Sequence, residues 1–351
     1  MYKRNFLAVI VLLILVAMLA GLAGCGTKNG QSAPGSQQGE GQGKKQVKVG
    51  VIYSIPDPAN GGGWDRVQIP GQEVLKNEFG WEVSIAESVP YSKVSEVAGS
   101  YADKGYDMVI FPDNGMIDSW KEVAKKYPDT WFVLMSVADQ LPEGSEKVAA
   151  WSPDMYTYGT VVGMVAAKAS KSGVIGLVAG TPIPALIIQF NGIIQGAKAV
   201  RPDAKVLISW VGNWEDVAKH SEATSLLIQQ GADIIYTLTG PGYKGVYEAA
   251  EKKGVPVIGY GADWYKDAPN VILTSVLFDG AKMYREMAKA YESGEMEKKI
   301  TTVGMDYVDL ADFHGKLSPE VEKDIKETFA KMKNGELKIP VKIDEQLKAV
   351  N

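Results

Sequence analysis

From residue 47 onwards, short apolar segments alternate with amphipathic ones, and this alternation constrains the fold more than any other feature. The apolar segments have the length and composition of strands, and the segments between them repeat apolar residues at helical spacing. Regular alternation of strand and helix predicts parallel sheets with right-handed crossovers. Strands are expected at residues 47–53, 82–86, 108–111, 131–135, 174–179, 205–209, 234–238 and 257–260, and helices near 65–79, 94–104, 117–127, 155–170, 185–200, 217–230 and 244–253.

The alternation pauses near Trp151 and then restarts, which predicts two doubly wound α/β lobes. Three further segments complete the sheets, so the chain must pass between the lobes more than once. Those segments are 271–276, 279–291 and 302–308, and the passages are expected near 150–154, 276–279 and 300–304. We expect an N-terminal lobe of residues 47–152 with 277–301 and a C-terminal lobe of residues 153–276 with 302–351. The polar tail after Ile339 is expected to dock only loosely.

The N-terminus has the pattern of an export signal. Lys3 and Arg4 precede a continuous apolar run over residues 6–20, and small residues then lead to Cys25. An apolar core of about 15 residues is short for a bilayer span. We therefore expect a lipoprotein signal peptide at residues 1–24 and lipidation, such as palmitoylation, of Cys25. The alternative is an N-terminal membrane anchor with an incidental cysteine.

Residues 25–46 would then form a flexible tether, because they are rich in Gly, Ser, Gln and Lys and lack apolar periodicity. The protein would be held at the extracytoplasmic face of the cell membrane through its lipid alone. Cleavage before Cys25 of the 351-residue chain leaves a body too long for one ordinary core and long enough for two.

Composition excludes several kinds of function. Cys25 is the only cysteine, so the body has neither a disulfide nor a thiolate nucleophile or metal ligand. With only His220 and His314, a histidine-rich metal site is not expected, and neither is a cofactor. A net charge of −5 without a basic cluster argues against a nucleic-acid partner. No nucleophile elbow is present, and acids in a binding cleft more simply accept hydrogen bonds, so we expect a protein that is not an enzyme.

Aromatic, carboxylate and carboxamide side chains recur where the predicted strands end. Ligands of open parallel sheets bind at the carboxyl ends of strands, so two facing lobes would place these groups in one cleft. A flat heteroaromatic ligand needs such a mixture, because aromatic faces stack on its rings while carboxylates and amides bind its edge. The candidates are Trp64, Asp65, Asp113, Asn114, Trp151, Phe190, Trp214, Asp263 and Asp279.

Several stretches together resemble the basic membrane lipoprotein (BMP) family of substrate-binding lipoproteins of ABC transporters. They are the export signal with its lipobox, the opening strand 49–53, Gly63-Trp64-Asp65, the Tyr156-x-x-Gly159-x-x-x-Gly163 helix, residues 176–192, 210–214 and Asp233-Ile234-Ile235. Within that family the chain is most similar to the purine-binding branch, through the GTPIP, WVGNW and GYGAD stretches. The resemblance implies the type I periplasmic-binding fold, with two lobes joined by a hinge of several crossings.

The resemblance also implies roles for particular residues. Trp64 would stack on the base, Trp151 and Trp214 would line the ring pocket with Phe190 nearby, and Asp263 would accept hydrogen bonds from the ligand. Two positions depart from the pattern. Asn114 stands where relatives tend to place a stacking aromatic residue, and residues 277–278 are apolar where the nucleoside branch tends to have a basic residue.

The sequence therefore predicts a monomeric capture protein for a purine, such as free adenine or a nucleoside, that serves a membrane permease. One alternative is the same fold with a flavin, another vitamin-like heterocycle or a sugar as ligand. Another is a sensory lipoprotein that signals through a membrane partner.

Overall fold

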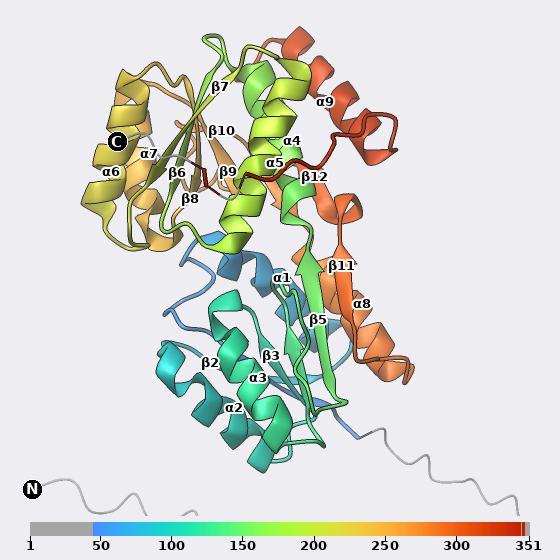
Figure 1. The fold of residues 1–351 in the computed structure, drawn as a ribbon. Coiled ribbons are helices and arrows are strands. Elements are labelled where there is room, and N and C mark those ends of the chain that lie inside the picture. The colour runs from blue at the N-terminus through green and yellow to red at the C-terminus, as the bar shows by residue number, and fades with distance from the viewer. Residues whose placement is uncertain (1–44, 345, 348–351) are drawn as a thin grey trace, which may run out of the picture. The chain divides into compact units, whose positions relative to one another are not determined.

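The computed structural model describes residues 45–344, 346 and 347, and it contains two six-stranded sheets (Figure 1). The expected signal peptide, Cys25 and nearly all of the tether lie outside the described residues. The strands and helices expected between residues 47 and 260 lie within a few residues of their predicted positions. None of the described helices is both long and apolar enough to span a bilayer.

The first sheet has the strand order β11-β5-β4-β3-β1-β2, with all neighbours parallel. Its strands are β1 (Lys48–Ile52), β2 (Glu82–Ala86), β3 (Met108–Phe111), β4 (Trp131–Leu134), β5 (Val148–Pro153) and β11 (Ile300–Val303). Its helices are α1 (Gly63–Asn77), α2 (Val94–Asp103), α3 (Ile117–Lys126) and α8 (Gly280–Glu292). We call this sheet with its helices the first lobe.

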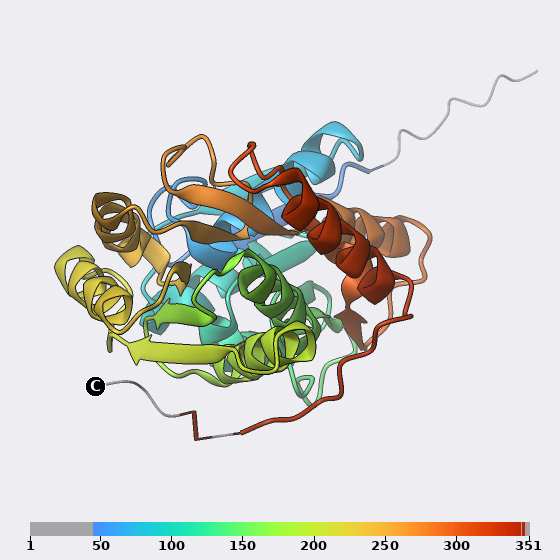
Figure 2. The ribbon, with the colours of Figure 1, turned by 90° about the horizontal axis from the view of Figure 1, so that it is seen from above.

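The second lobe is built on a sheet of order β12-β10-β9-β8-β6-β7. Its strands are β6 (Val174–Ala179), β7 (Lys205–Trp210), β8 (Ile234–Leu238), β9 (Val257–Gly261), β10 (Ile272–Phe278) and β12 (Val308–Leu310). Its helices are α4 (Met155–Ala169), α5 (Pro184–Val200), α6 (Val217–Gln229), α7 (Tyr243–Lys253) and α9 (Pro319–Lys333). Figure 2 shows α6 and α7 on one side of this sheet and α4 and α5 on the other.

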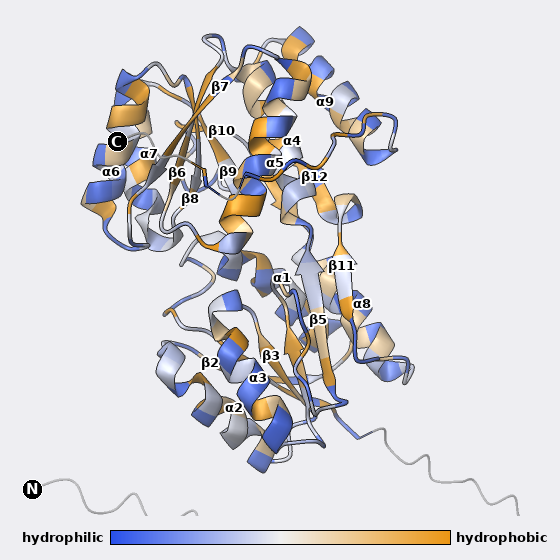
Figure 3. Ribbon diagram, viewed as in Figure 1, coloured by the Kyte–Doolittle hydropathy of each residue, from blue (hydrophilic) through white to orange (hydrophobic). Residues whose placement is uncertain are grey.

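The central strands of each sheet are buried on both faces, which explains why strands such as β3, β4 and β8 are mostly apolar, whereas the edge strands are partly exposed and carry polar residues (Figure 3). In β3, Met108 and Ile110 pack with the helix α1 side of the first lobe, whereas Val109 and Phe111 pack with Trp120 of α3. This alternation of burial confirms the doubly wound α/β class that the sequence predicts.

The last two strands, β11 and β12, are divided between the two sheets. The segment 302–308 is not a single strand, because β11 joins the first sheet and, after a short 3₁₀ helix at Met305–Tyr307, β12 joins the second. Strand β12 runs antiparallel to β10. Helix α9 was not anticipated. It begins where Ser318 accepts a hydrogen bond from the Val321 amide, and it covers α4.

The chain passes between the sheets at three places: between β5 and α4, between β10 and α8, and between β11 and β12. Two backbone hydrogen bonds join these passages, from Asp154 N to Val303 O at 2.9 Å and from Asp279 N to Tyr307 O at 2.8 Å. The Asp154 and Asp279 carboxylates each cap the helix that follows. Adjacent, mutually bonded crossings of this kind form the hinge.

The Tyr156-x-x-Gly159-x-x-x-Gly163 motif is a helix-packing motif. A Cβ atom at Gly159 would lie 2.1 Å from the Gln189 carbonyl oxygen, and one at Gly163 would lie 2.0 Å from that of Ile193. Helices α4 and α5 therefore touch backbone to backbone, which only glycine permits at these positions.

The C-terminal tail is docked, contrary to expectation. Tyr156 donates a hydrogen bond to the Pro340 carbonyl at 2.7 Å and accepts one from the Lys342 amide at 3.1 Å. The Asn191 side chain bonds both the amide and the carbonyl of Asp344, at 2.8 and 3.0 Å. Two buried polar side chains on α4 and α5 thus bind the polar C-terminal strap, residues 340–344, whose composition does not predict docking.

Candidate ligand-binding site

Trp64, at the start of α1, is fixed by the ends of two strands of the first lobe. Its indole N–H donates to the carbonyls of Pro112 and Met135, both at 2.9 Å, and these residues follow β3 and β4. The half-buried ring meets Phe278 edge to face, with centroids 5.1 Å apart. The indole N–H is therefore used within the protein, and only the ring can contact a ligand.

Asp65 follows Trp64 and lies near a second acid, Asp113, which comes from the loop after β3. Burial, reinforced by the charge of Asp113, raises the pKa of Asp65 to about 7. No cationic side chain among the described residues offsets these two effects. Asp65 is thus a half-buried carboxyl group that changes its charge state near neutral pH.

Asp113 is held by its neighbours. Its Oδ1 accepts from the Gly115 amide at 2.7 Å, which caps the 3₁₀ helix Asn114–Met116, and its Oδ2 accepts from the Tyr91 hydroxyl. Ser54 in turn donates to the Tyr91 hydroxyl at 3.4 Å. These hydrogen bonds fix the Asp113 carboxylate near enough to Asp65 for its charge to act on that group.

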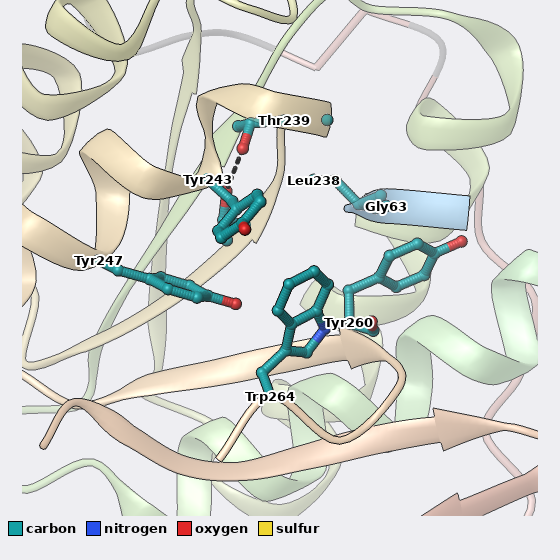
Figure 4. A pocket seen from close by; sticks show the side chains of 9 residues that line it. Gly63, Leu238, Thr239, Tyr243, Tyr247, Tyr260 and Trp264 are labelled. Atoms are coloured by element: carbon teal, nitrogen blue, oxygen red, sulfur yellow. Dashed lines mark hydrogen bonds between the residues drawn. The ribbon is translucent and has the colours of Figure 1, made fainter. Parts of the chain in front are cut away.

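The second lobe contributes an aromatic and hydroxyl-rich wall around a small cavity (Figure 4). The Tyr243 and Trp264 rings lie 4.8 Å apart, and the Tyr247 ring meets both. The Trp264 indole donates to the Tyr260 carbonyl at 2.8 Å. The full lining is Gly63, from the first lobe, with Thr237, Leu238, Thr239, Gly240, Tyr243, Tyr247, Tyr260 and Trp264.

The two walls face each other across the lobes. Gly63 of α1 lines the second-lobe cavity, and the charge of Asp65 contributes to raising the pKa of Tyr260, after burial and Tyr158. A carboxylate pair from the first lobe thus stands opposite tyrosine, threonine and tryptophan side chains of the second. Such a cleft can stack an aromatic ring and accept hydrogen bonds from its edge.

Four of the predicted residues lie at the inner ends of strands in or beside this region. Trp64, Asp65 and Asp113 are brought together, as described above. Asn114 begins the 3₁₀ helix after β3, half-buried, and its carboxamide makes no hydrogen bond to the described residues. It is therefore free to bind a ligand.

Trp151, Phe190 and Trp214 have different surroundings. Trp151 is buried within β5, where it is paired with Thr301 of β11. Phe190 is fully buried and stacks on Trp210, with centroids 5.1 Å and planes 17° apart. Trp214 packs against Gly180 and lines a shallow surface hollow with residues 212–216 and Thr181.

Asp263 and Asp279 are exposed and already have structural partners. Asp263 accepts from the Tyr265 amide at 3.0 Å. Asp279 lies at the hinge and accepts from the Lys282 amide at 2.8 Å as the cap of α8. Both carboxylates are thus engaged in local structural hydrogen bonds.

Sequence reasoning missed most of the second-lobe wall. Thr239 and Trp264 follow β8 and β9, so they meet the same criterion as the predicted candidates, a position at the end of a strand. Tyr243 and Tyr247 are four residues apart on α7, the spacing that places two side chains on one helix face. That spacing was the available signal for them.

Comparison with known proteins gives a consistent picture. A sequence model of the Bmp family, described as ABC transporter substrate-binding protein PnrA-like, matches residues 47–342. A purine-binding protein of Brucella abortus (strain 2308) is 29% identical over 304 residues, which are 85% of this chain and 84% of the relative. The ABC transporter nucleoside-binding protein BmpA of Lactococcus lactis subsp. cremoris (strain MG1363) is 26% identical over 260 residues, 71% of this chain and 69% of the relative.

Solved structures show the same fold. An ABC transporter solute-binding protein from Conexibacter woesei superimposes with a TM-score of 0.68 at 24% identity, covering 84% of this chain and 98% of the other. At this identity, the likeness concerns the arrangement of the two lobes.

Proposed function

The chain belongs to the Bmp family of PnrA-like ABC transporter substrate-binding proteins, and on this premise we propose that it captures a purine between its lobes. The ligand is a free nucleobase such as adenine, or a nucleoside, and the protein delivers it to a membrane permease. The observation that carries this proposal is the approach of the start of α1 to the tyrosine-rich wall of the second lobe: Gly63 lines the cavity there, and the charge of Asp65 acts on Tyr260. Purine-binding and nucleoside-binding relatives support it.

Binding would use each group for one task. The Trp64 ring stacks on the base, since its N–H is already bonded to the protein. The carboxylates of Asp65 and Asp113 accept from N–H groups on the edge of the base, and Asn114 can either donate or accept. Tyrosine and threonine hydroxyls of the second lobe complete the site when the lobes close.

Two features favour a nucleobase over a nucleoside. Residues 277–278, where the nucleoside branch tends to have a basic residue, are apolar here, and Phe278 is buried against Trp64. A ribose would therefore find an aromatic side chain in place of a hydrogen-bonding cation. The residues that line the second-lobe cavity also include no cationic side chain.

The remaining parts of the proposal concern place and organisation. The signal peptide 1–24 is removed, Cys25 is lipidated, and the tether to residue 46 keeps a monomeric head at the extracytoplasmic face near its permease. The lobe boundaries follow the ends of β5, β10 and β11, so the predicted bounds shift by one or two residues: the first lobe comprises residues 47–153 with 279–303, and the second comprises 154–278 with 304 onwards. No catalytic step is required of any residue.

A ligand screen tests the proposal. Isothermal titration of the full-length protein in detergent micelles is performed with adenine, adenosine, riboflavin and D-glucose. We expect adenine to bind with the highest affinity and adenosine more weakly. Binding of riboflavin or glucose without binding of either purine would overturn the purine assignment. Uptake of labelled adenine by cells lacking the protein then separates transport from sensing, because a sensor's loss leaves uptake unchanged.

A further inference from the structure

Arg66, on α1 of the first lobe, reaches across to the second lobe. Its Nη2 donates to Oδ2 of Asp267 at 2.9 Å, and its guanidinium carbon lies 4.1 Å from the centre of the Trp264 ring. Both partners belong to the loop between β9 and β10. The two charged side chains keep 21% and 31% of their surface exposed, so water screens the ion pair only in part.

Each end of this contact is rigid within its own lobe. On α1, Trp64 is bonded to two carbonyls, and Gln68 donates to the Met135 carbonyl at 3.3 Å. In the loop, Trp264 is 2% exposed and donates to the Tyr260 carbonyl, while the Asp267 amide donates to the Trp264 carbonyl at 3.1 Å. Because neither end can follow the other, separation of the lobes must break the contact.

The start of α1 is shaped for this approach. Gly62 has a φ of 84°, and a Cβ atom there would lie 2.8 Å from the Tyr243 ring. The same Cβ atom would lie 3.2 Å from the Gly240 carbonyl oxygen, whereas a Cβ atom at Gly63 would be in ordinary contact with Gly240, at 3.8 Å. The lack of a side chain at Gly62 therefore allows the start of α1 to contact the second-lobe wall that Arg66 also reaches.

We propose that Arg66, Asp267 and Trp264 form a latch that holds the two lobes closed over the bound ligand. Arg66 acts as a positioning residue: it directly follows Trp64 and Asp65 in the chain, yet its side chain is committed to the opposite lobe. Trp64 and Asp65 would bind the ligand and Arg66 would hold the second lobe, so ligand binding and lobe closure are coupled through consecutive residues of α1. This inference rests on the proposed function for the identity of the bound ligand. The contact between the lobes does not depend on that function.

The chemistry requires arginine in particular. A planar guanidinium can lie on the indole face and donate to a carboxylate at the same time, whereas an ammonium group does one of these well. Arg66→Lys should therefore recover only part of the latch.

The first test measures rates of adenine binding to the full-length protein in detergent micelles by stopped flow. Arg66→Met and Asp267→Asn should each raise the dissociation rate about three- to tenfold and leave the association rate within about twofold. The exchange Arg66→Asp with Asp267→Arg should restore part of the loss. Equal dissociation rates in wild type and Arg66→Met would overturn the proposal.

The matched control is the ion pair of Arg285 with Glu78, which joins α8 to α1 within the first lobe through two hydrogen bonds of 2.7 and 2.6 Å. Arg285→Met removes an ion pair that lies within one lobe and is somewhat more exposed, at 33% and 46%, and it should leave both rates unchanged. An increase in dissociation equal to that of Arg66→Met would show a general loss of stability and overturn the latch.

A second measurement needs no ligand, so it separates the failure of the latch from failure of the purine proposal. Hydrogen exchange of the unliganded full-length protein is followed by mass spectrometry. Arg66→Met should speed exchange in both residues 61–67 and 262–268, and Arg285→Met should not. Unchanged exchange in both segments would overturn the latch even if no purine binds.

Discussion

At the scale of single residues, Trp64 and Asp65 show how neighbours in sequence divide the work of a site. Trp64 is anchored through its N–H to two carbonyls of the first lobe, so its ring has a set orientation. Asp65 has no such anchor, and burial beside Asp113 raises its pKa to about 7. N–H donors of a bound ligand would stabilise the ionised form of this buried carboxyl group.

The raised pKa of Asp65 has a consequence for stability. The folded protein binds more protons than the unfolded chain between the ordinary pKa of 3.8 and the folded value of about 7, so stability falls as pH rises through this window. Relative to Asp65→Asn, the wild type should lose about 1–3 kcal/mol of unfolding free energy between pH 5 and pH 8. Denaturant unfolding at both pH values measures this. A difference between the two proteins that is independent of pH would contradict it.

Trp64 yields a prediction on affinity. Trp64→Ala should weaken adenine binding by about 1–3 kcal/mol, the scale of one base–aromatic stack. Trp64→Phe keeps a ring but loses both hydrogen bonds to Pro112 and Met135. It should retain more of the affinity than Trp64→Ala. Calorimetry on both variants decides, and an unchanged affinity in Trp64→Ala would remove the ring from the site.

At the scale of elements, the helix pair α4 and α5 sets the second lobe against the hinge. Glycines on both helices allow backbone contact, and α4 begins directly at the crossing after β5. The same pair carries Tyr156 and Asn191, which hold the C-terminal strap. Because the two helices pack so closely, we expect them to move as one rigid unit next to the hinge.

This packing predicts a large effect for a small change. A methyl group at Gly163 would lie 2.0 Å from the Ile193 carbonyl oxygen, so Gly163→Ala must push the helices apart. We expect a loss of about 1–3 kcal/mol in the free energy of unfolding, measured by denaturant titration. Lys198→Ala, at an exposed position of α5, is the control and should change stability by less than about 0.5 kcal/mol. Equal stabilities of Gly163→Ala and the control would show that the helices can separate without cost.

At the scale of the whole described body, two kinds of contact join the lobes. The crossings at β5–α4, β10–α8 and β11–β12 are covalent and bonded to each other, so they form an axis about which the lobes can turn. The contacts of Gly62, Gly63 and Arg66 are non-covalent and can separate. A binding protein needs both, because the first preserves the pairing of the lobes and the second responds to ligand.

Local patterning was enough to predict most strands, most helices and the two lobes, because neighbouring residues alone show the periodicities of strands and helices. The family was indicated by the resemblance of several motifs. Local patterning also led to Trp64, Asp65 and Asp113, which directly follow strands or begin a helix. It failed at the split of residues 302–308, at α9 and at the docked tail, whose partners lie far away in the chain.

Only tertiary contacts distinguish the strand-end residues that line the cleft from those that have structural partners. Phe190 stacks on Trp210 in the core and Asp279 caps a helix, whereas Tyr260, Trp264 and Tyr243 form the second wall. The Arg66–Asp267 pair joins positions 201 apart in the chain. A side chain's role in a cleft depends on groups brought from distant segments and on the water they exclude, and neither quantity is encoded in local spacing.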